Sequence, residues 1–447
     1  MYRHRELWVG IFLFAILAGC SKDKELNVQG AYSPIIENLS ADKEPAVRGD
    51  VNTLTAQVLN VRGLPLQFHW TAGAGTLTDS TSATVHWTAP DSIGSYPVTV
   101  AVTAHDDVNN VDFYQTRTFQ VYVDNEFTRW TRSAAVQFDV APPVENRIYY
   151  SEIRNSLTGE SDVWGVTGAL GAPQQITNGY FNATQPTVDS DGSQVAFAGR
   201  VTGTEGGPSI WTVPSTGGDP ATATEVVPFG PNGNHLLGSP RFAPTGPNLL
   251  FTSDTLSFAF NRPKPWKRDV SDFSSPPISI SNTDPQAFEN TNINAAYPYA
   301  SWRGTGDSIV CESYTNYTFP GQTSRGLFKF NAAGSAPVNP DPVPVWLNDP
   351  TAAEPDWSPD GSHIIFTRRA PGRTDRDIWI INAGSSDPAT AVRVTFGPAD
   401  DSHPRFSSDG SKIFFVSNRA DRYGLNGVYE TERRGTNIWS VGRFDQP

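Results

Sequence analysis

The sequence predicts an all-β protein in which a β-sandwich precedes a six-bladed β-propeller, and three observations support this fold class. The 447 residues include 38 glycines, 36 prolines and a single methionine, a composition typical of short strands joined by tight turns. Residues 31–124 alternate apolar and polar side chains with the period of a β-strand. Residues 126–447 contain six self-similar units, which is typical of a repeat architecture.

Charge and cysteine content exclude two classes of protein. The formal net charge is −13 and the sequence pI is about 5.0, which argues against a nucleic-acid partner. Two cysteines are too few for a disulfide-stapled scaffold.

The N-terminus has the pattern of a secretion signal over residues 1–19. Arg3 and Arg5 precede the apolar run Leu7–Leu17 (LWVGIFLFAIL), which is too short to cross a bilayer as a helix. An uncleaved anchor helix is the alternative. The polar residues 20–30 are expected to form a flexible tether.

The end of this signal is similar to a bacterial lipobox. It reads Leu17-Ala18-Gly19-Cys20, and Ser21 follows the cysteine. The resemblance implies cleavage before Cys20 and acylation of that residue, so that the lipid anchors the chain in the cell envelope. Ser21 suggests delivery to the outer membrane, on its periplasmic face or at the cell surface. A coincidental cysteine is the alternative. Acylation would leave Cys311 as the remaining thiol.

Residues 31–124 are expected to form about seven short strands. Apolar side chains alternate in Leu66, Phe68 and Trp70, and again along Val98, Val100 and Val102. The segments FHWTAGAGTL, VHWTAP and GSYPVTVAVTA resemble Ig-like domains of the PKD type, which implies a β-sandwich that serves as a spacer or binds a glycan or protein. His69 and His86, each next to a tryptophan, are expected to be exposed strand residues.

The repeat units share a strand, a turn and a second strand. The six segments begin at Phe138, Pro186, Pro240, Trp302, Pro355 and Pro404. In the first segment we expect Pro142-Pro143 to replace the turn, and the fourth is degenerate. A second landmark follows most units: Asp162-Val-Trp164, Ser209-Ile-Trp211, Gly326-Leu-Phe328, Asp377-Ile-Trp379 and Asn437-Ile-Trp439. The third unit lacks a clean copy, and the segment Trp266–Ile280 is expected to stand in for it.

This pattern predicts one four-stranded blade per unit. The glycine of the Asp-Gly turn accepts a positive φ, and the aromatic residues are expected to pack between blades. The last unit ends near the C-terminus with three strands. We therefore expect residues 126–132 to supply its outer strand and close the ring.

The motifs P-x-W-S-P-D-G-x-x-I-x-F and D-I-W resemble the TolB-type, WD-like propeller repeats of bacterial envelope proteins. The resemblance covers about 320 residues and implies the fold and a general binding role. TolB proteins carry an α/β domain before the propeller, where this chain has the PKD-like sandwich, so a role in the Tol-Pal system does not follow.

No catalytic or cofactor motif is found, and we assign neither a cofactor nor a metal. The sequence lacks Gly-x-Ser-x-Gly, a P-loop, a dinucleotide fingerprint and His-Glu-x-x-His. Residues at the start of each innermost strand are expected to surround the mouth of the central channel. The candidates are Gln185, Ser239, Arg241, Glu354, Asp356, His403 and Arg405. Glu354 and His403 could bind a metal, although a solvated channel lip is the favoured interpretation.

These features favour a non-enzymatic lipoprotein of the cell envelope whose propeller binds a protein partner or a glycan. The alternative is a polysaccharide lyase or hydrolase that acts at the central channel. Exposed aromatics such as Tyr314, Tyr317 and Phe319 would support glycan binding if they line one groove. The irregular stretch 254–296 is either a functional insertion or a decayed blade. The pair Asp400-Asp401, with Asp421 near Arg419 and Arg422, is expected to lie in turns rather than to bind calcium.

Overall fold

The computed structural model describes most of the chain after the N-terminal region. The described residues are 33–133, 135–144, 146–229, 237–254, 263–280, 299–314, 325–332, 346–397, 399–419 and 437–442. The predicted signal (1–19), Cys20 and the tether (20–30) lie outside them. Within these ranges no helix has the length and apolarity needed to cross a membrane.

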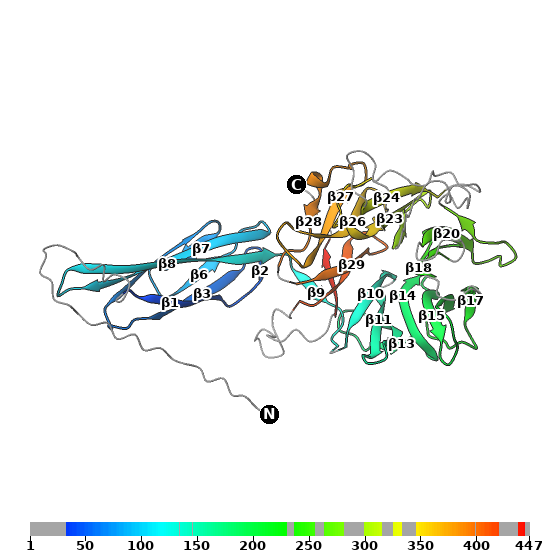
Figure 1. Ribbon diagram of the computed structural model, residues 1–447, viewed down its shortest axis with the longest axis horizontal. Helices are drawn as coiled ribbons and strands as arrows, with labels where there is room; N and C mark the ends of the chain where they lie inside the picture. Colours follow the sequence, from blue (N-terminus) through cyan, green and yellow to red (C-terminus); the bar gives the residue numbers. More distant parts are fainter. Residues whose placement is uncertain are drawn as a thin grey trace, which may run out of the picture.

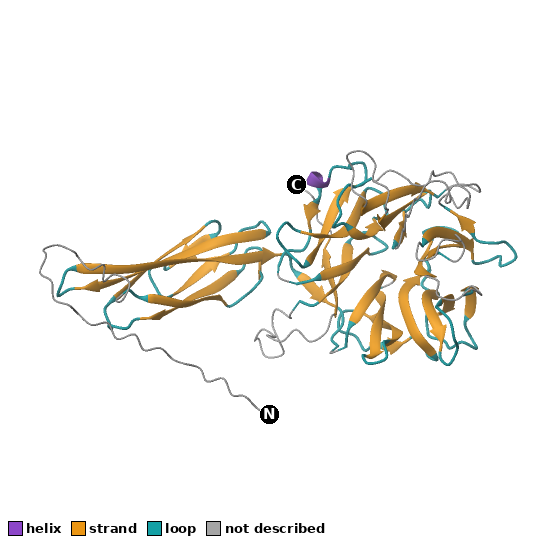
Figure 2. Ribbon diagram, in the orientation of Figure 1, coloured by secondary structure: helices purple, strands orange, loops and turns teal. Residues whose placement is uncertain are grey.

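The described chain is all-β, as predicted, and it forms two parts that follow each other along the sequence (Figure 1). Figure 2 shows strands throughout both parts and one short 3₁₀ helix, η2 (Pro388–Thr390).

The N-terminal part is a pair of four-stranded sheets. One sheet has the order β1-β3-β6-β5 and the other β2-β8-β7-β4. The strands are β1 (Ile35–Ala41), β2 (Ala46–Val47), β3 (Val51–Leu59), β4 (Leu66–Ala72), β5 (Thr76–Thr78), β6 (Thr84–Thr88), β7 (Gly94–Asp106) and β8 (Val111–Asp124).

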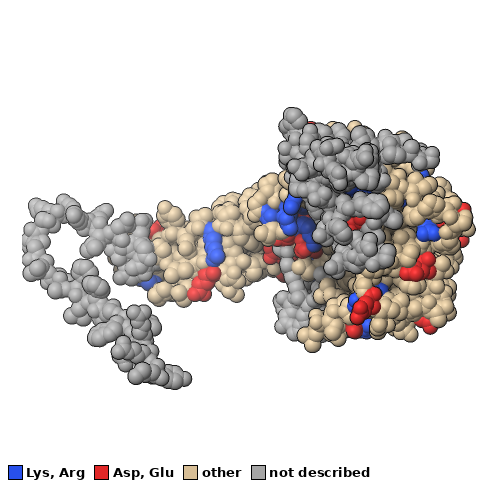
Figure 3. Space-filling view, turned by 45° about the vertical axis from the view of Figure 1, so that its right-hand side comes forward, with Lys and Arg blue, Asp and Glu red and all other residues tan. Residues whose placement is uncertain are grey.

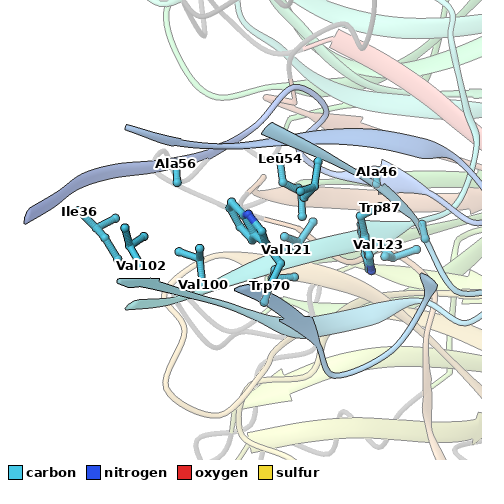
Figure 4. Packing of buried hydrophobic residues seen from close by; sticks show 13 residues of the cluster. Ile36, Ala46, Leu54, Ala56, Trp70, Trp87, Val100, Val102, Val121 and Val123 are labelled. Atoms are coloured by element: carbon cyan, nitrogen blue, oxygen red, sulfur yellow. The ribbon is translucent and has the colours of Figure 1, made fainter. Parts of the chain in front are cut away.

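An apolar core lies between these two sheets (Figure 4). Trp70 and Trp87 are almost fully buried, and each indole N–H is satisfied by a main-chain carbonyl at 2.8 Å. The apolar residues of the alternating pattern therefore point into the core between the sheets, as the sequence predicts. His69 and His86 alternate with the tryptophans and are exposed, as expected.

The C-terminal part contains the six blades of the predicted propeller. The first two blades share one eight-stranded sheet, because a single parallel pair, Ser161↔Asn182, joins β12 to β14. From the first to the sixth, the blades contain β10–β13, β14–β17, β18–β21, β22–β24, β25–β28, and β29–β31 with β9.

The bounds of these strands are β9 (Phe127–Arg129), β10 (Gln137–Val144), β11 (Arg147–Asn155), β12 (Glu160–Thr167), β13 (Gln174–Gln175), β14 (Tyr180–Val188), β15 (Gln194–Val201), β16 (Ser209–Pro214), β17 (Thr224–Val227), β18 (Leu237–Phe242), β19 (Asn248–Ser253), β20 (Lys264–Asp269), β21 (Ile278–Ser279), β22 (Ala300–Trp302), β23 (Ser308–Tyr314), β24 (Arg325–Asn331), β25 (Ala353–Trp357), β26 (His363–Arg369), β27 (Arg376–Asn382), β28 (Val392–Arg393), β29 (Asp401–Phe406), β30 (Lys412–Ser417) and β31 (Asn437–Gly442).

The repeat landmarks occupy equivalent places in all six blades. The large side chain of the second strand faces the landmark aromatic of the third strand across one registered pair. The pairs are Tyr150↔Trp164, Phe197↔Trp211, Phe251↔Trp266, Cys311↔Phe328, Phe366↔Trp379 and Phe415↔Trp439. Trp266 thus takes the landmark position in the third blade. Six apolar clusters, one between each two successive blades, contain most of these residues.

The hairpin turn of each blade has one residue with left-handed backbone. In the second to sixth blades this residue is glycine, with φ between 71° and 78°. The first blade uses Asn146, at φ 62°, and asparagine tolerates this region better than most residues. The expectation that Pro142-Pro143 forms this turn is wrong, because both prolines lie in β10 and the turn follows them.

The ring is closed by a strand from outside the last repeat. β9 pairs antiparallel with β31 and gives the sixth blade its fourth strand. The following Trp130 is 3% exposed, and its indole N–H donates to Ser440 Oγ. This pairing is the arrangement expected for residues 126–132.

The sandwich contacts the fifth blade where the two parts meet. The Asn125 side chain donates to the main-chain oxygen of Val394 at 2.7 Å, and the rings of Tyr122 and Phe396 lie 6.0 Å apart. Basic and acidic side chains gather near this junction in Figure 3. The two parts are therefore held by specific contacts as well as by the chain.

The irregular stretch 254–296 contributes regular structure to the third blade. Its described part supplies the two outer strands, β20 and β21. Residues 255–262 and 281–298 lie outside the described ranges.

Candidate channel site

One residue from each blade surrounds the centre of the propeller. Five lie within the innermost strand of their blade, and Tyr299 lies directly before β22 at the equivalent place. We call them the channel ring: Asp139, Gln185, Ser239, Tyr299, Glu354 and His403.

A backbone irregularity directs these side chains. The register of the innermost strand shifts at this position in five blades, and five of the six residues have a φ between 50° and 57°. Bulges of this kind re-aim a side chain next to functional sites. A proline directly follows the ring residue in four blades, and its missing N–H suits a break in the ladder.

Hydrogen bonds join the ring residues of successive blades. The Gln185 main-chain N–H donates to Asp139 Oδ2 at 3.2 Å, and the Ser239 N–H donates to Gln185 Oε1 at 2.6 Å. In the same manner the His403 N–H donates to Glu354 Oε2 at 2.8 Å. The side chains of Asp139, Gln185 and Glu354 therefore each hold the backbone of the next blade.

His403 closes the ring between the last blade and the first. Its Nε2 lies 3.3 Å from Asp139 Oδ1 and 3.6 Å from Glu354 Oε1. Its ring lies 5.8 Å from that of Tyr299 in an edge-on arrangement. Among the described residues no group of three or more His, Cys, Asp and Glu side chains is arranged to hold a metal ion.

Two residues further along the strands, a second polar layer lies beneath the ring. Asp356 accepts from Ser301 Oγ at 2.7 Å and from the Phe406 N–H at 2.9 Å. Arg241 and Arg405 belong to the same layer and are 7% and 2% exposed. Buried charges at this density are expensive for folding, which is typical of a site kept for function.

Burial and neighbouring charges set the ionisation of the carboxyl groups. Burial raises the pKa of Asp139, although His403, Arg241 and Arg405 oppose that effect. Burial also opposes ionisation of Glu354, but His403 and Arg376 outweigh it and lower its pKa.

The structure places all seven sequence-predicted candidates in these two layers. Gln185, Ser239, Glu354 and His403 belong to the ring, while Arg241, Asp356 and Arg405 lie in the layer beneath it. Their role in binding stays a prediction.

Sequence reasoning missed two members of the ring and two supports. Asp139 and Tyr299 belong to the irregular first and fourth units, which lack the proline that marks the position elsewhere. The available signal was their place in the chain: Asp139 comes directly before Val140, and Tyr299 comes directly before the strand Ala300–Trp302.

Two further residues support the ring at Glu354. Glu312 accepts from the Glu354 N–H at 2.8 Å, and Arg376 donates to Glu354 Oε1 at 3.1 Å. No repeat pattern marks these two residues.

The remaining candidates have structural surroundings. Asp400 pairs with Arg376 at 2.9 Å and Asp401 with Arg419 at 2.7 Å. Asp401 is the first residue of β29, so the expectation that it lies in a turn is wrong. Cys311 is fully buried, and burial raises the pKa of its thiol well above the usual value. The side chain of Tyr314 and the residues Tyr317, Phe319, Asp421 and Arg422 lie outside what the structure describes.

No protein-family model matches the chain, and no curated protein matches it. Similar solved structures include TolB from Acinetobacter baumannii, 15% identical, with a TM-score of 0.41 over 84% of this chain and 80% of that one. A putative TolB from Agrobacterium tumefaciens is 11% identical, with a TM-score of 0.41 over 79% and 99%. An auxiliary nutrient binding protein from Bacteroides thetaiotaomicron is 9% identical, with a TM-score of 0.40 over 92% and 97%. At these values the similarity carries no argument about what the chain binds.

Proposed function

We propose that this chain is a lipid-anchored protein of the cell envelope whose propeller is a non-enzymatic binding scaffold. The observation that carries the proposal is the channel ring, in which hydrogen bonds join buried and half-buried polar side chains to the backbone of the next blade. A rigid polar mouth of this kind binds a partner without first having to order itself.

The hydrogen bonds of the ring favour binding over catalysis. Both oxygens of Glu354 are engaged, one by Arg376 and the other by the His403 N–H. Both oxygens of Asp356 are engaged by Ser301 and the Phe406 N–H. A general acid or base needs a carboxyl group free to exchange a proton with a substrate, which these two are not.

Anchoring would add to the affinity of such a site. Two or three acyl chains on Cys20 would hold the propeller at the membrane surface, where partners in the same envelope meet it at a high effective concentration. The sandwich would set the distance between the propeller and the membrane.

Site-specific photo-crosslinking tests this function. A photoreactive residue at Tyr299, in the channel ring, is compared with one at His69, on the exposed face of the sandwich. We expect a defined adduct in intact envelopes from position 299 and none from position 69. The adduct should weaken in a Cys20→Ser chain, which would also leave the membrane fraction. Equal labelling from both positions, or no adduct from position 299, contradicts the proposal.

One cavity favours a glycan as a second candidate ligand. A space of about 530 Å³ lies beside the segment after β9, and its lining includes Tyr150, Glu152 and Trp164. Aromatic rings beside a carboxylate and an amide are the groups that sugars contact, and here Gln137 Nε2 donates to Glu152 Oε2 at 2.8 Å. Binding of envelope glycans by the full chain, lost in Trp164→Ala, would favour this candidate over a protein partner.

A further inference from the structure

Two arginines face each other across the centre of the propeller. Arg241 lies on β18 of the third blade and Arg405 on β29 of the sixth, which are opposite positions in a ring of six. Both are more than nine-tenths buried. The two charges are close enough to interact: burial, and after it the charge of Arg405, lower the pKa of Arg241 to about 9.

Few of their hydrogen-bond donors are used. Arg241 Nη1 donates to the main-chain oxygens of Pro240 at 2.9 Å and Pro186 at 3.4 Å, and Arg405 Nη1 donates to that of Pro404 at 2.7 Å. The Nε atoms of both arginines are buried without a partner. A guanidinium has five N–H donors, so most of each fork is unengaged.

Other arginines of the propeller have an acidic partner. Arg376, Arg393 and Arg419 each donate to a carboxylate at 3.1 Å or less. Within the described ranges, neither Arg241 nor Arg405 has a carboxylate at ion-pair distance. By this contrast the two channel arginines are buried charges with no carboxylate close enough for an ion pair.

The nearby acids Asp356 and Asp139 raise the pKa of Arg241, against the effect of burial, but neither forms an ion pair with it. Both oxygens of Asp356 accept from other groups, and Asp139 accepts from the Gln185 N–H and lies against His403. A buried charge without a partner strongly destabilises a fold, and a native structure that keeps two of them has a reason to do so. His403 adds one more buried nitrogen, Nδ1, that has no partner.

We propose that the centre of the channel binds an oxyanion between the guanidinium forks of Arg241 and Arg405. The fork matches the spacing of carboxylate and phosphate oxygens, and such charge-assisted bonds are strong in a site shielded from water. The anion is either free in the envelope or a carboxylate carried into the channel by the partner. This inference deepens the proposed binding function and rests on it.

The test is a titration of the full chain with inorganic phosphate, acetate and N-acetylglycine, each against sodium chloride at equal ionic strength. Binding is followed by calorimetry and by the melting temperature, which rises when a ligand binds the native state. We expect saturable binding by at least one oxyanion and none by chloride. Binding of phosphate alone identifies a free anion, whereas binding of N-acetylglycine identifies a chain-terminal carboxylate.

Three variants decide whether the arginines form the site. Arg405→Met is expected to abolish binding, and Arg405→Lys, which keeps the charge without the fork, is expected to weaken it by about tenfold or more. The control, Arg303→Met, removes a half-buried arginine between β22 and β23 that pairs with Asp307 at 3.4 Å, and this variant should bind like the wild type. Arg405→Lys serves as the deciding variant if Arg405→Met does not fold.

Two outcomes would overturn the inference. The first is a wild-type chain that binds none of the three anions, and the second is equal binding by the wild type and Arg405→Lys. Either outcome leaves the photo-crosslink from Tyr299 untouched, so failure of the anion site is distinguishable from failure of the scaffold function.

Discussion

The sandwich encloses Trp70 and Trp87 among valines, whereas the propeller encloses Arg241, Arg405 and Glu354 at its centre. In the sandwich, each of the two indole N–H groups has a carbonyl partner, and the buried amide of Asn52 donates to the Lys43 oxygen at 2.7 Å. At the centre of the propeller, buried guanidinium nitrogens remain without a partner. Both regions are built mainly from antiparallel strands, although β7 and β8 of the sandwich, of 13 and 14 residues, are longer than the described strands of the propeller.

The two parts differ in what they bury: the sandwich buries mainly apolar side chains, whereas the centre of the propeller buries charged ones. Apolar area removed from water stabilises the sandwich and the contacts between blades, at roughly 25 cal/mol per Å². The centre of the propeller works against that gain, because buried charged groups lose hydration. A region that destabilises its own fold and is nevertheless organised by hydrogen bonds is the better candidate for binding.

Removal of the closing strand should have the largest effect and should affect only the propeller. Deletion of residues 126–132 eliminates the β9–β31 ladder and the buried Trp130, which packs edge-on against Phe414 at 5.0 Å. Loss of one buried tryptophan costs about 3–5 kcal/mol, and the unpaired edge of β31 adds to that, so we expect a loss above about 5 kcal/mol. Differential scanning calorimetry should show a lower propeller transition and an unchanged sandwich transition.

A point substitution on the same strand provides the control. Thr128 is exposed on β9, so Thr128→Ala should change stability by less than about 0.5 kcal/mol. An unaltered propeller transition after the deletion would mean that β9 does not close the ring.

The matched change in the sandwich is Trp87→Ala. Trp87 has no exposed surface, and its N–H bond to the Ala74 oxygen also fixes the loop before β5. We expect a loss of about 3–5 kcal/mol from the sandwich transition alone. His86→Ala, one residue away on the exposed face, is the control and should have little effect. If Trp87→Ala lowers both transitions equally, the two parts unfold as one unit and the comparison between them fails.

The architecture was predictable because its signals are local and repeated. Trp211, Trp379 and Trp439 recur at one strand position, and the Asp-Gly turns recur between strands, so even the degenerate fourth unit could be placed. The turn of the first blade was misplaced because Pro142 and Pro143 resemble a turn signal. A left-handed Asn146 forms that turn instead.

The site was predictable only in part, because its contacts join distant blades. The proline after Gln185 or His403 marks a ring position, but nothing in the sequence shows that His403 lies against Asp139, far away in the chain. Ring closure brings these residues together. The missing partners of Arg241 and Arg405 are likewise visible only in three dimensions.

The smallest of the expected effects comes from Glu312, which supports the ring from β23. Burial, with the charge of Glu354 acting in the same direction, raises the pKa of Glu312 to about 7, from an ordinary value of 4.5. Between these two pH values the native chain holds a proton that the unfolded chain has released. The contribution of Glu312 to stability is therefore fully present at low pH, falls as the pH rises from about 4.5 to about 7, and is constant above that range.

Glu312→Gln should remove this dependence, because the amide oxygen can still accept from the Glu354 N–H without carrying a charge. At pH 8 the variant should be more stable than the wild type by about 2–3 kcal/mol, and the difference should vanish below pH 4.5. Glu37→Gln, at an exposed position of β1, should alter stability by less than about 0.5 kcal/mol at either pH. Denaturant unfolding at several pH values measures both variants. A stabilised Glu312→Gln chain would show that the centre of the propeller retains charge at the expense of its own stability, whereas a wild-type pH profile in that variant would show that Glu312 keeps its ordinary ionisation.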